Sequence, residues 1–195
     1  MSERRASGAA LLGLLLLAAI RASSEDAYPS DITPPAGTQY PCALTALPRG
    51  LPGIPQADRE YVNRTYARVL RATQAKLVLL KALEERQDLD ARLGRYLSAL
   101  EPLVQRQRND RVPAGLEPFQ QDVLSALGLQ QAFFSKAVPL RDAGRGMDEA
   151  YRIAEGRQAS ARLIAAWSRM QARYPGWPAA TRDSVYHHLC ALDLF

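Results

Sequence analysis

The stretch that decides the fold runs from Asp58 to Gln87 and reads DREYVNRTYARVLRATQAKLVLLKALEERQ. Its apolar side chains recur every three or four residues, at Val62, Tyr66, Val69, Leu70, Leu77, Leu80 and Leu83. This spacing places them along one face of a single long α-helix. A helix with one apolar face must bury that face against other elements, and the alternating pattern of a strand is almost absent from the chain. The sequence therefore predicts an all-α fold.

The same spacing predicts three further long helices and a short last one. Pro102 lies within the second helix and predicts a kink or restart near Glu101, and Pro139 begins a predicted loop. The second predicted helix runs from Asp88, which we expect to act as a cap, beyond Val104. The third runs from near Pro118, a favourable first-turn residue, to Val138. The fourth runs from about Asp148 to Tyr174, and the short last helix carries Val185, Leu189 and Leu192.

The segments between these helices are short, and the first joint is little more than Gln87 and Asp88. Short joints force neighbouring helices to run antiparallel. We therefore expect an up-down-up-down four-helix bundle with a short C-terminal helix. A secreted helical cytokine is disfavoured, because those bundles need long crossover connections.

Residues 1–24 have the pattern of an export signal. Arg4 and Arg5 precede an apolar run over residues 6–20, and small residues then offer a cleavage site before Glu25. The run is shorter than the roughly 20 residues that span a bilayer. We therefore expect a signal peptide that is removed, the alternative being an uncleaved membrane anchor. The mature chain is expected in the periplasm or outside the cell, with no stable membrane span.

Residues 25–55 hold seven of the chain's thirteen prolines. Proline fixes φ and removes a hydrogen-bond donor, so this stretch is predicted to be an extended arm. The predicted organisation is a signal peptide (1–24), a Pro-rich arm (25–55) and a helical bundle domain (56–195). Four apolar side chains are expected to pack the arm along the bundle: Leu44, Leu47, Leu51 and Ile54.

The chain has two cysteines, Cys42 in the arm and Cys190 in the last predicted helix. An even number of cysteines in an exported chain favours a disulfide, which would close a loop worth about 5 kcal/mol in the chain-entropy model. The alternative is a metal site. Asp183, His187 and Cys190 are spaced by four and three residues on one helix face, and a tetrahedral site would need a further ligand, for which Cys42 is the candidate. We expect the disulfide.

The net charge is +5 for the whole chain and +3 without residues 1–24. So small an excess of positive charge does not favour nucleic-acid binding. The basic residues are nearly all arginine, and alanine is abundant, which favours a bacterial source. Asn63 begins an N-x-T sequon, interpreted as a chance match. Five arginines recur along the fourth predicted helix without sharing one face, so a solvated surface is expected: Arg152, Arg157, Arg162, Arg169 and Arg173.

No specific catalytic motif is present. Asp183, Ser184 and His187 or His188 supply the residue types of a catalytic triad, but three members on one short helix do not form its geometry. The Glu-x-x-His pairs of di-iron bundles and the C-x-x-C-H of covalent haem are absent. We therefore expect no enzymatic activity and no cofactor.

An aromatic turn, Tyr174-Pro175-Gly176-Trp177-Pro178, ends the fourth predicted helix. The two prolines hold Trp177 in a rigid turn, and aromatic side chains on rigid loops often anchor protein interfaces. We expect Tyr174 and Trp177 to contact an unidentified envelope or extracellular protein. The alternative is that Trp177 closes the end of the bundle core.

In size, export and helix content the chain resembles periplasmic helical chaperones of the envelope-stress type. Leu44-Thr45-Ala46-Leu47-Pro48 departs from their L-T-x-x-Q signature at the fifth position, so their function is not carried over. The predicted function is protein–protein contact by an exported, non-catalytic helical bundle. The alternative is a bundle that binds a small ligand or a metal through its C-terminal histidines and cysteine.

Overall fold

The computed structural model of the 195-residue chain describes residues 27–28 and 44–194. These residues form helices and turns and contain no strand, which confirms the predicted all-α class. The helices are α2 (Gln56–Glu85), α3 (Leu89–Asn109), α4 (Glu117–Asp142), α5 (Met147–Tyr151), α6 (Ala154–Arg173) and α7 (Ala179–Leu192). None of the helices in this part of the chain is long and apolar enough to cross a membrane.

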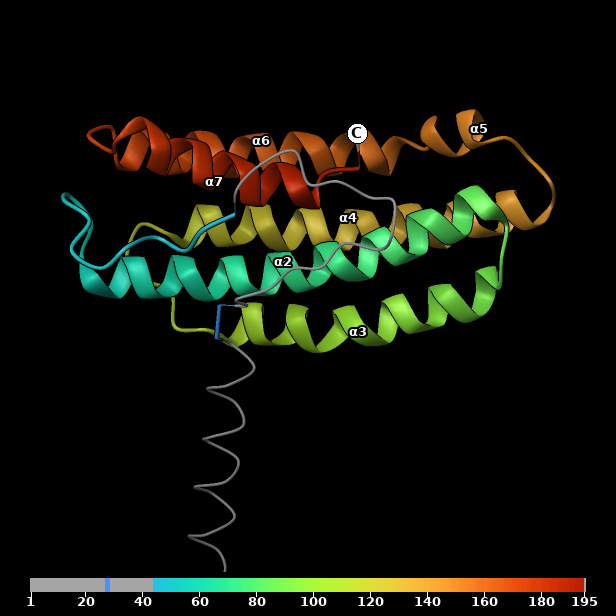
Figure 1. The fold of residues 1–195 in the computed structure, drawn as a ribbon, viewed down its shortest axis with the longest axis horizontal. Coiled ribbons are helices and arrows are strands. Elements are labelled where there is room, and N and C mark those ends of the chain that lie inside the picture. The colour runs from blue at the N-terminus through green and yellow to red at the C-terminus, as the bar shows by residue number, and fades with distance from the viewer. Residues whose placement is uncertain (1–26, 29–43, 195) are drawn as a thin grey trace, which may run out of the picture.

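The long helices alternate in direction, as the short joints predicted (Figure 1). Helix α3 packs on α2 and α4, and α4 packs on α6. The short helix α7 contacts both α6 and α2. It therefore fills the space between the last and the first long helix and closes the ring of the bundle.

Two prolines lie inside continuous helices, where the sequence predicted a kink or restart at Pro102 and a loop at Pro139. Helix α3 is continuous through Pro102, and α4 continues through Pro139 to Asp142. Both prolines are exposed. A carbonyl that loses its helical partner at such a position faces water, which supplies the missing hydrogen bond.

The predicted fourth helix is divided at Arg152 and Ile153 into α5 and α6. Ile153 has extended backbone angles and precedes the first turn of α6. Neither proline nor glycine marks this break in the sequence. The sequence pattern therefore could not reveal it.

The joint between α2 and α3 is made by two residues in the left-handed region. Arg86 has φ 54° and Asp88 has φ 48°. Asp88 occupies the cap position of α3, as predicted. Its side chain makes no capping hydrogen bond, so the predicted role of that side chain is wrong. The Arg86 guanidinium instead donates to the carbonyls of Gly144 and Arg145, which ties this joint to the loop after α4.

The core is continuous through the bundle, and the stripe that predicted α2 lies mainly inside it. Val62, Tyr66, Val69, Leu70 and Leu83 are buried, as predicted. Leu77 and Leu80 are only half-buried, and Leu79 takes the inward position between them. Each fully buried aliphatic or aromatic side chain stabilises the fold by about 1.5–3 kcal/mol.

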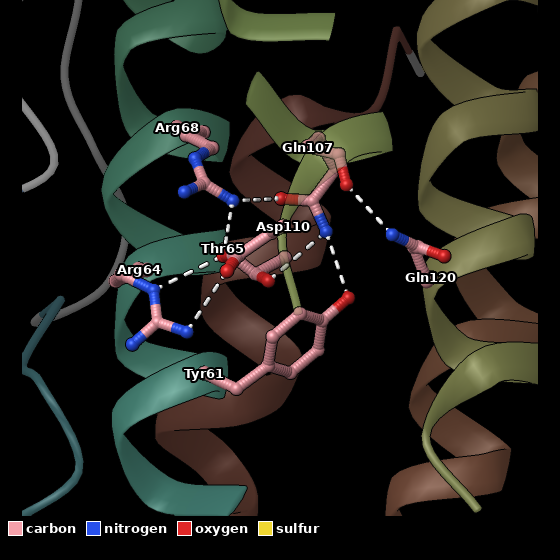
Figure 2. A network of polar contacts seen from close by, with 7 residues as sticks. All are labelled: Tyr61, Arg64, Thr65, Arg68, Gln107, Asp110 and Gln120. Carbon is pink, nitrogen blue, oxygen red and sulfur yellow. Dashed lines mark hydrogen bonds and ion pairs between the residues drawn. The ribbon is translucent and has the colours of Figure 1, made fainter. Parts of the chain in front are cut away.

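A buried polar network joins α2 to the end of α3 (Figure 2). Arg64 binds both carboxylate oxygens of Asp110 at 3.0 Å, and Arg68 binds the same carboxylate at 2.8 Å. Burial alone would raise the pKa of Asp110, but the hydrogen bonds and charges of the two arginines outweigh it and lower the pKa. The carboxylate therefore stays ionised and holds the α2–α3 pair in one register.

Gln107 extends this network to a third helix. Its Oε1 accepts from Arg68 at 2.9 Å, and its Nε2 donates to Tyr61 and Thr65 at 3.0 and 3.1 Å. Gln120 of α4 donates to the backbone carbonyl of Gln107 at 2.7 Å (Figure 2). Buried polar groups without such partners would cost free energy, so the network favours one alignment of α2, α3 and α4.

Candidate functional site

Residues 44–55, here called the arm segment, turn back beside α2 towards α7 (Figure 1). The surface of α2 and α7 that bonds to this segment is here called the groove. The Ser184 hydroxyl of α7 donates to the carbonyl of Thr45 at 2.8 Å. Asn63 of α2 bonds to Leu47. Both helices therefore hold the arm segment through its main chain.

The contact between Asn63 and Leu47 is a two-point clamp. The Leu47 N–H donates to Asn63 Oδ1 at 2.7 Å, and Asn63 Nδ2 donates to the Leu47 carbonyl at 3.1 Å. The Leu47 side chain is only 2% exposed. The asparagine of the sequon therefore uses its side-chain amide to hold the arm segment.

His188 lies at the centre of α7 and is fully buried. Its ring stacks on Tyr66 of α2, with centroids 4.2 Å apart and an interplanar angle of 12°. Its Nδ1 lies 2.6 Å from the Ser184 carbonyl, and its Nε2 lies 2.5 Å from the Tyr28 hydroxyl. Since a carbonyl only accepts, Nδ1 carries the proton and Nε2 accepts from Tyr28.

This environment keeps the imidazole neutral. Burial lowers the pKa of His188 from 6.5 to about 4; the backbone bond to Ser184 opposes this change, and the neighbouring His187 adds to it. A neutral ring with both nitrogens occupied acts as a packing and hydrogen-bonding element between α7, α2 and Tyr28. Burial also raises the pKa of the Tyr28 hydroxyl, so it remains a donor.

The C-terminal end of α7 is capped by buried donors from two other helices. Lys76 of α2 donates to the carbonyl of Ala191 at 2.7 Å and to that of Asp193, and Gln130 of α4 donates to the Leu192 carbonyl at 2.5 Å. A cation at a helix C-terminus is also favoured by the helix dipole. Burial lowers the pKa of Lys76 to about 8, against the opposing effects of Asp193 and Cys190.

The alternative metal site does not form in the described part of the chain. No group of three or more His, Cys, Asp or Glu side chains in residues 27–28 and 44–194 is placed to hold a metal ion. Asp183 is exposed, and His187 and Cys190 are half-buried. Sharing one helix face is therefore not enough to bring Asp183, His187 and Cys190 together as ligands. Cys42 lies outside the described residues, so the disulfide to Cys190 stays a prediction.

The residue types of a triad on α7 are committed to other contacts. The Ser184 hydroxyl donates to Thr45, and His188 Nδ1 donates to the Ser184 carbonyl rather than to a carboxylate. Asp183 is exposed to solvent. These contacts attach α7 to the arm segment and do not activate the serine.

The expectation that Tyr174 and Trp177 form a contact surface is not supported, because both side chains are buried. Tyr174 is 5% and Trp177 3% exposed, and their rings stack with centroids 4.5 Å apart. The Tyr174 hydroxyl donates to buried Asp58 at 2.6 Å, and Arg173 binds the same oxygen at 3.0 Å. The alternative, in which Trp177 closes the end of the core, agrees with this geometry.

The arginines of α6 are largely paired. Arg162 and Arg169 both bind Asp122 of α4, a buried carboxylate, at 3.3 and 2.5 Å. Arg173 binds Asp58 of α2. These ion pairs attach α6 to its neighbours across the bundle. They explain why the arginines recur without forming one basic stripe.

A second surface lies over the outer sides of α4 and α6. One depression of about 620 Å³ is lined by residues that include Gly128, Leu129 and Ala165. Another, of about 460 Å³, is lined by residues that include Tyr151 and Ile164. Ala161 lines both depressions. Ile164 is 58% exposed, the largest fraction among the large hydrophobic side chains of the described residues.

No protein-family model matches the chain, and comparison with curated proteins and with solved structures finds no match either.

Two polar residues of this region, Lys76 and Asp122, were not identified from the sequence although a signal existed, and His188 was named only as a candidate triad member or ligand. Lys76 falls on the apolar stripe, four residues before Leu80 and seven after Val69. Asp122 falls between Phe119 and Ala126 in the same way. A charged residue on an apolar stripe indicates a buried partner. For His188, only the neighbouring Val185 and Leu189 hinted at burial.

The environment of His188 predicts a specific loss of stability in acid. Because the folded-state pKa lies below the unfolded value, the unfolded chain binds the proton first as the pH falls from 6.5 to about 4. This site then lowers the free energy of unfolding by about 3 kcal/mol across that window. Denaturant titrations should show that His188→Gln loses about 3 kcal/mol less stability between pH 6.5 and 4 than the wild type.

His187→Gln is the matched control, since it makes the same change one residue away and removes only the last-ranked of the three influences on the pKa of His188. Most of the loss of stability in acid should therefore remain in this variant. If His188→Gln and the wild type decline in parallel, His188 is not the buried neutral group described above.

Proposed function

We propose that the chain is an exported, non-catalytic helical-bundle protein that acts by binding another protein in the cell envelope or outside the cell. The observation that carries this proposal is the exposed Ile164 side chain, on a surface over α4 and α6 that also holds the polar side chains of Gln158 and Arg162. Ile164 is well exposed there, beside two depressions that share Ala161. Two large apolar side chains exposed at one depression, Tyr151 and Ile164, mark a candidate interaction site. This surface replaces Tyr174 and Trp177 as the candidate contact.

The buried polar groups of the bundle support a binding function over a catalytic one. Asp58, Asp110 and Asp122 each bind arginines that join helices. Lys76 binds the end of α7, and His188 stacks on Tyr66 and so attaches α7 to α2. Each of these charged or titratable groups already stabilises the fold. These contacts account for the buried polar groups, but they do not account for the exposed apolar side chain of Ile164.

Export and the disulfide between Cys42 and Cys190 belong to the same proposal, and chain length supports the disulfide. Cys42 is three residues from Thr45, whose carbonyl is bonded to Ser184 of α7. Three extended residues span about 10 Å, and the six residues from Ser184 to Cys190 rise about 9 Å along the helix. Tyr28, on the other side of Cys42 in the sequence, also contacts α7 through His188.

The disulfide predicts a mass difference. The protein isolated from its native compartment without reductant should be lighter by two hydrogens than after reduction, and neither cysteine should react with iodoacetamide before unfolding. Cys42→Ala should abolish the difference and release one reactive thiol. Two alkylated cysteines in the natively isolated protein would contradict both the disulfide and the oxidising compartment.

The contact surface predicts that one charge on α6 blocks binding. Ile164→Asp should reduce capture of the partner by tagged protein about ten-fold or more, because burial of this side chain at an interface is worth about 1.5–3 kcal/mol. The measurement is quantitative mass spectrometry of proteins captured from the compartment to which the chain is exported.

Val78→Asp is the matched control, since Val78 is an exposed apolar side chain on α2 and should leave capture at the wild-type level. Equal capture by all three proteins, or no specific capture by the wild type, would refute the proposed contact.

A further inference from the structure

The arm segment reaches its groove by a sharp reversal of the chain. Leu47 is clamped beside Asn63, which lies two turns inside α2, although only eight residues separate Leu47 from the start of that helix. Gly50 and Gly53 make the reversal, with φ 73° and 76°. A Cβ at either glycine would meet nothing within 4 Å. The two positions therefore need glycine for their backbone angles and not for space.

The groove holds the arm segment in the way that a protein holds an extended peptide. Its polar contacts include both main-chain groups of Leu47 and the carbonyl of Thr45. Its apolar contacts are the buried side chains of Leu47 and Leu51, which are 2% and 8% exposed, while Pro48, Arg49 and Gly50 between them are exposed. Main-chain bonds with buried side-chain anchors recognise a segment by its conformation. None of these contacts depends on which copy of the chain supplies the segment.

We infer that the groove between α2 and α7 also binds residues 44–51 of a second copy, so that two copies exchange their arms. This inference does not depend on the surface over α4 and α6. Gly53 is the hinge. When its backbone is extended, the flanking Pro52 and Pro55 carry the arm segment away from its own groove, because proline restricts both itself and the residue before it.

When Cys42 and Cys190 are reduced, the form with each arm in its own groove (closed) and the form with exchanged arms share every contact of the groove. They differ only at the hinge and in their dependence on concentration. In the closed form the arm segment is tethered beside its own groove, at an effective concentration of about millimolar for a short linker. The wild type is therefore monomeric at micromolar concentration. Any change that disfavours positive φ at residue 53 penalises the closed form alone and moves the balance towards exchange.

Gly53→Val is the direct test, because a β-branched residue disfavours positive φ and prefers an extended backbone. The substitution should disfavour the closed form by about ten-fold at each hinge. Because the dimer has two hinges, its dissociation constant should fall by about a hundred-fold. Sedimentation velocity of the mature chain, residues 25–195, in reductant and at concentrations from 1 to 100 μM measures the dimer dissociation constant. Gly53→Ala should shift the constant in the same direction and serves if the valine variant does not fold.

Gly144→Val is the matched control. Gly144 also has a positive φ, 82°, and open space around it, but it lies in the loop after α4. It should strain the fold in a similar way and remain monomeric. Adding Leu47→Asp to Gly53→Val should abolish the dimer, because a buried charge cannot occupy the groove.

Complementation identifies the exchanged segment. One chain carries Gly53→Val with Leu47→Asp, so its groove is intact and its arm cannot be seated. The other carries Gly53→Val with Asn63→Ala and Ser184→Ala, so its arm is intact and its groove lacks the polar clamp. Each alone should be monomeric, and an equal mixture should form a heterodimer. A monomeric Gly53→Val and Gly53→Ala, or a mixture that stays monomeric, would overturn the inference.

Discussion

The capping of α7 by buried donors is the interaction on which the remaining structure depends. Lys76 and Gln130 come from two different long helices and bind the last carbonyls of α7. A short terminal helix has little stability of its own, so these bonds and the burial of Val185, Leu189 and Leu192 hold it in place. With α7 in place, the bundle is a closed ring rather than a row of four helices.

The seating of α7 also creates the region that the arm segment occupies. Ser184 and His188 lie on the side of α7 that faces α2 and supply the bonds to Thr45 and Tyr28. The charged groups inside the bundle, such as Asp122 and Asp110, likewise join helices to one another. The chemistry of the interior therefore stabilises the fold. The contacts with other molecules that we propose involve the exposed surface around Ile164 and the groove.

The features that could be predicted from the sequence are local. The spacing of Val62, Tyr66 and Val69 and the short joint at Gln87 were sufficient for the helices and their alternating directions, because both depend on neighbours along the chain. The division between α5 and α6 and the partners of Asp122 depend on packing between distant segments. Trp177 shows the same limit, because a stiff aromatic turn has the same sequence whether it faces solvent or closes the core.

Native-state hydrogen exchange of the α7 amides tests the seating of this helix most directly. If α7 is an integral part of the ring, the amides of Val185 and Leu189 open with the same free energy as those of Leu70 in α2 and respond equally to low denaturant, because all exchange through global unfolding. If the α7 amides exchange through a separate opening of lower free energy while α2 remains protected, α7 is an appendage, and the structural account of the groove fails.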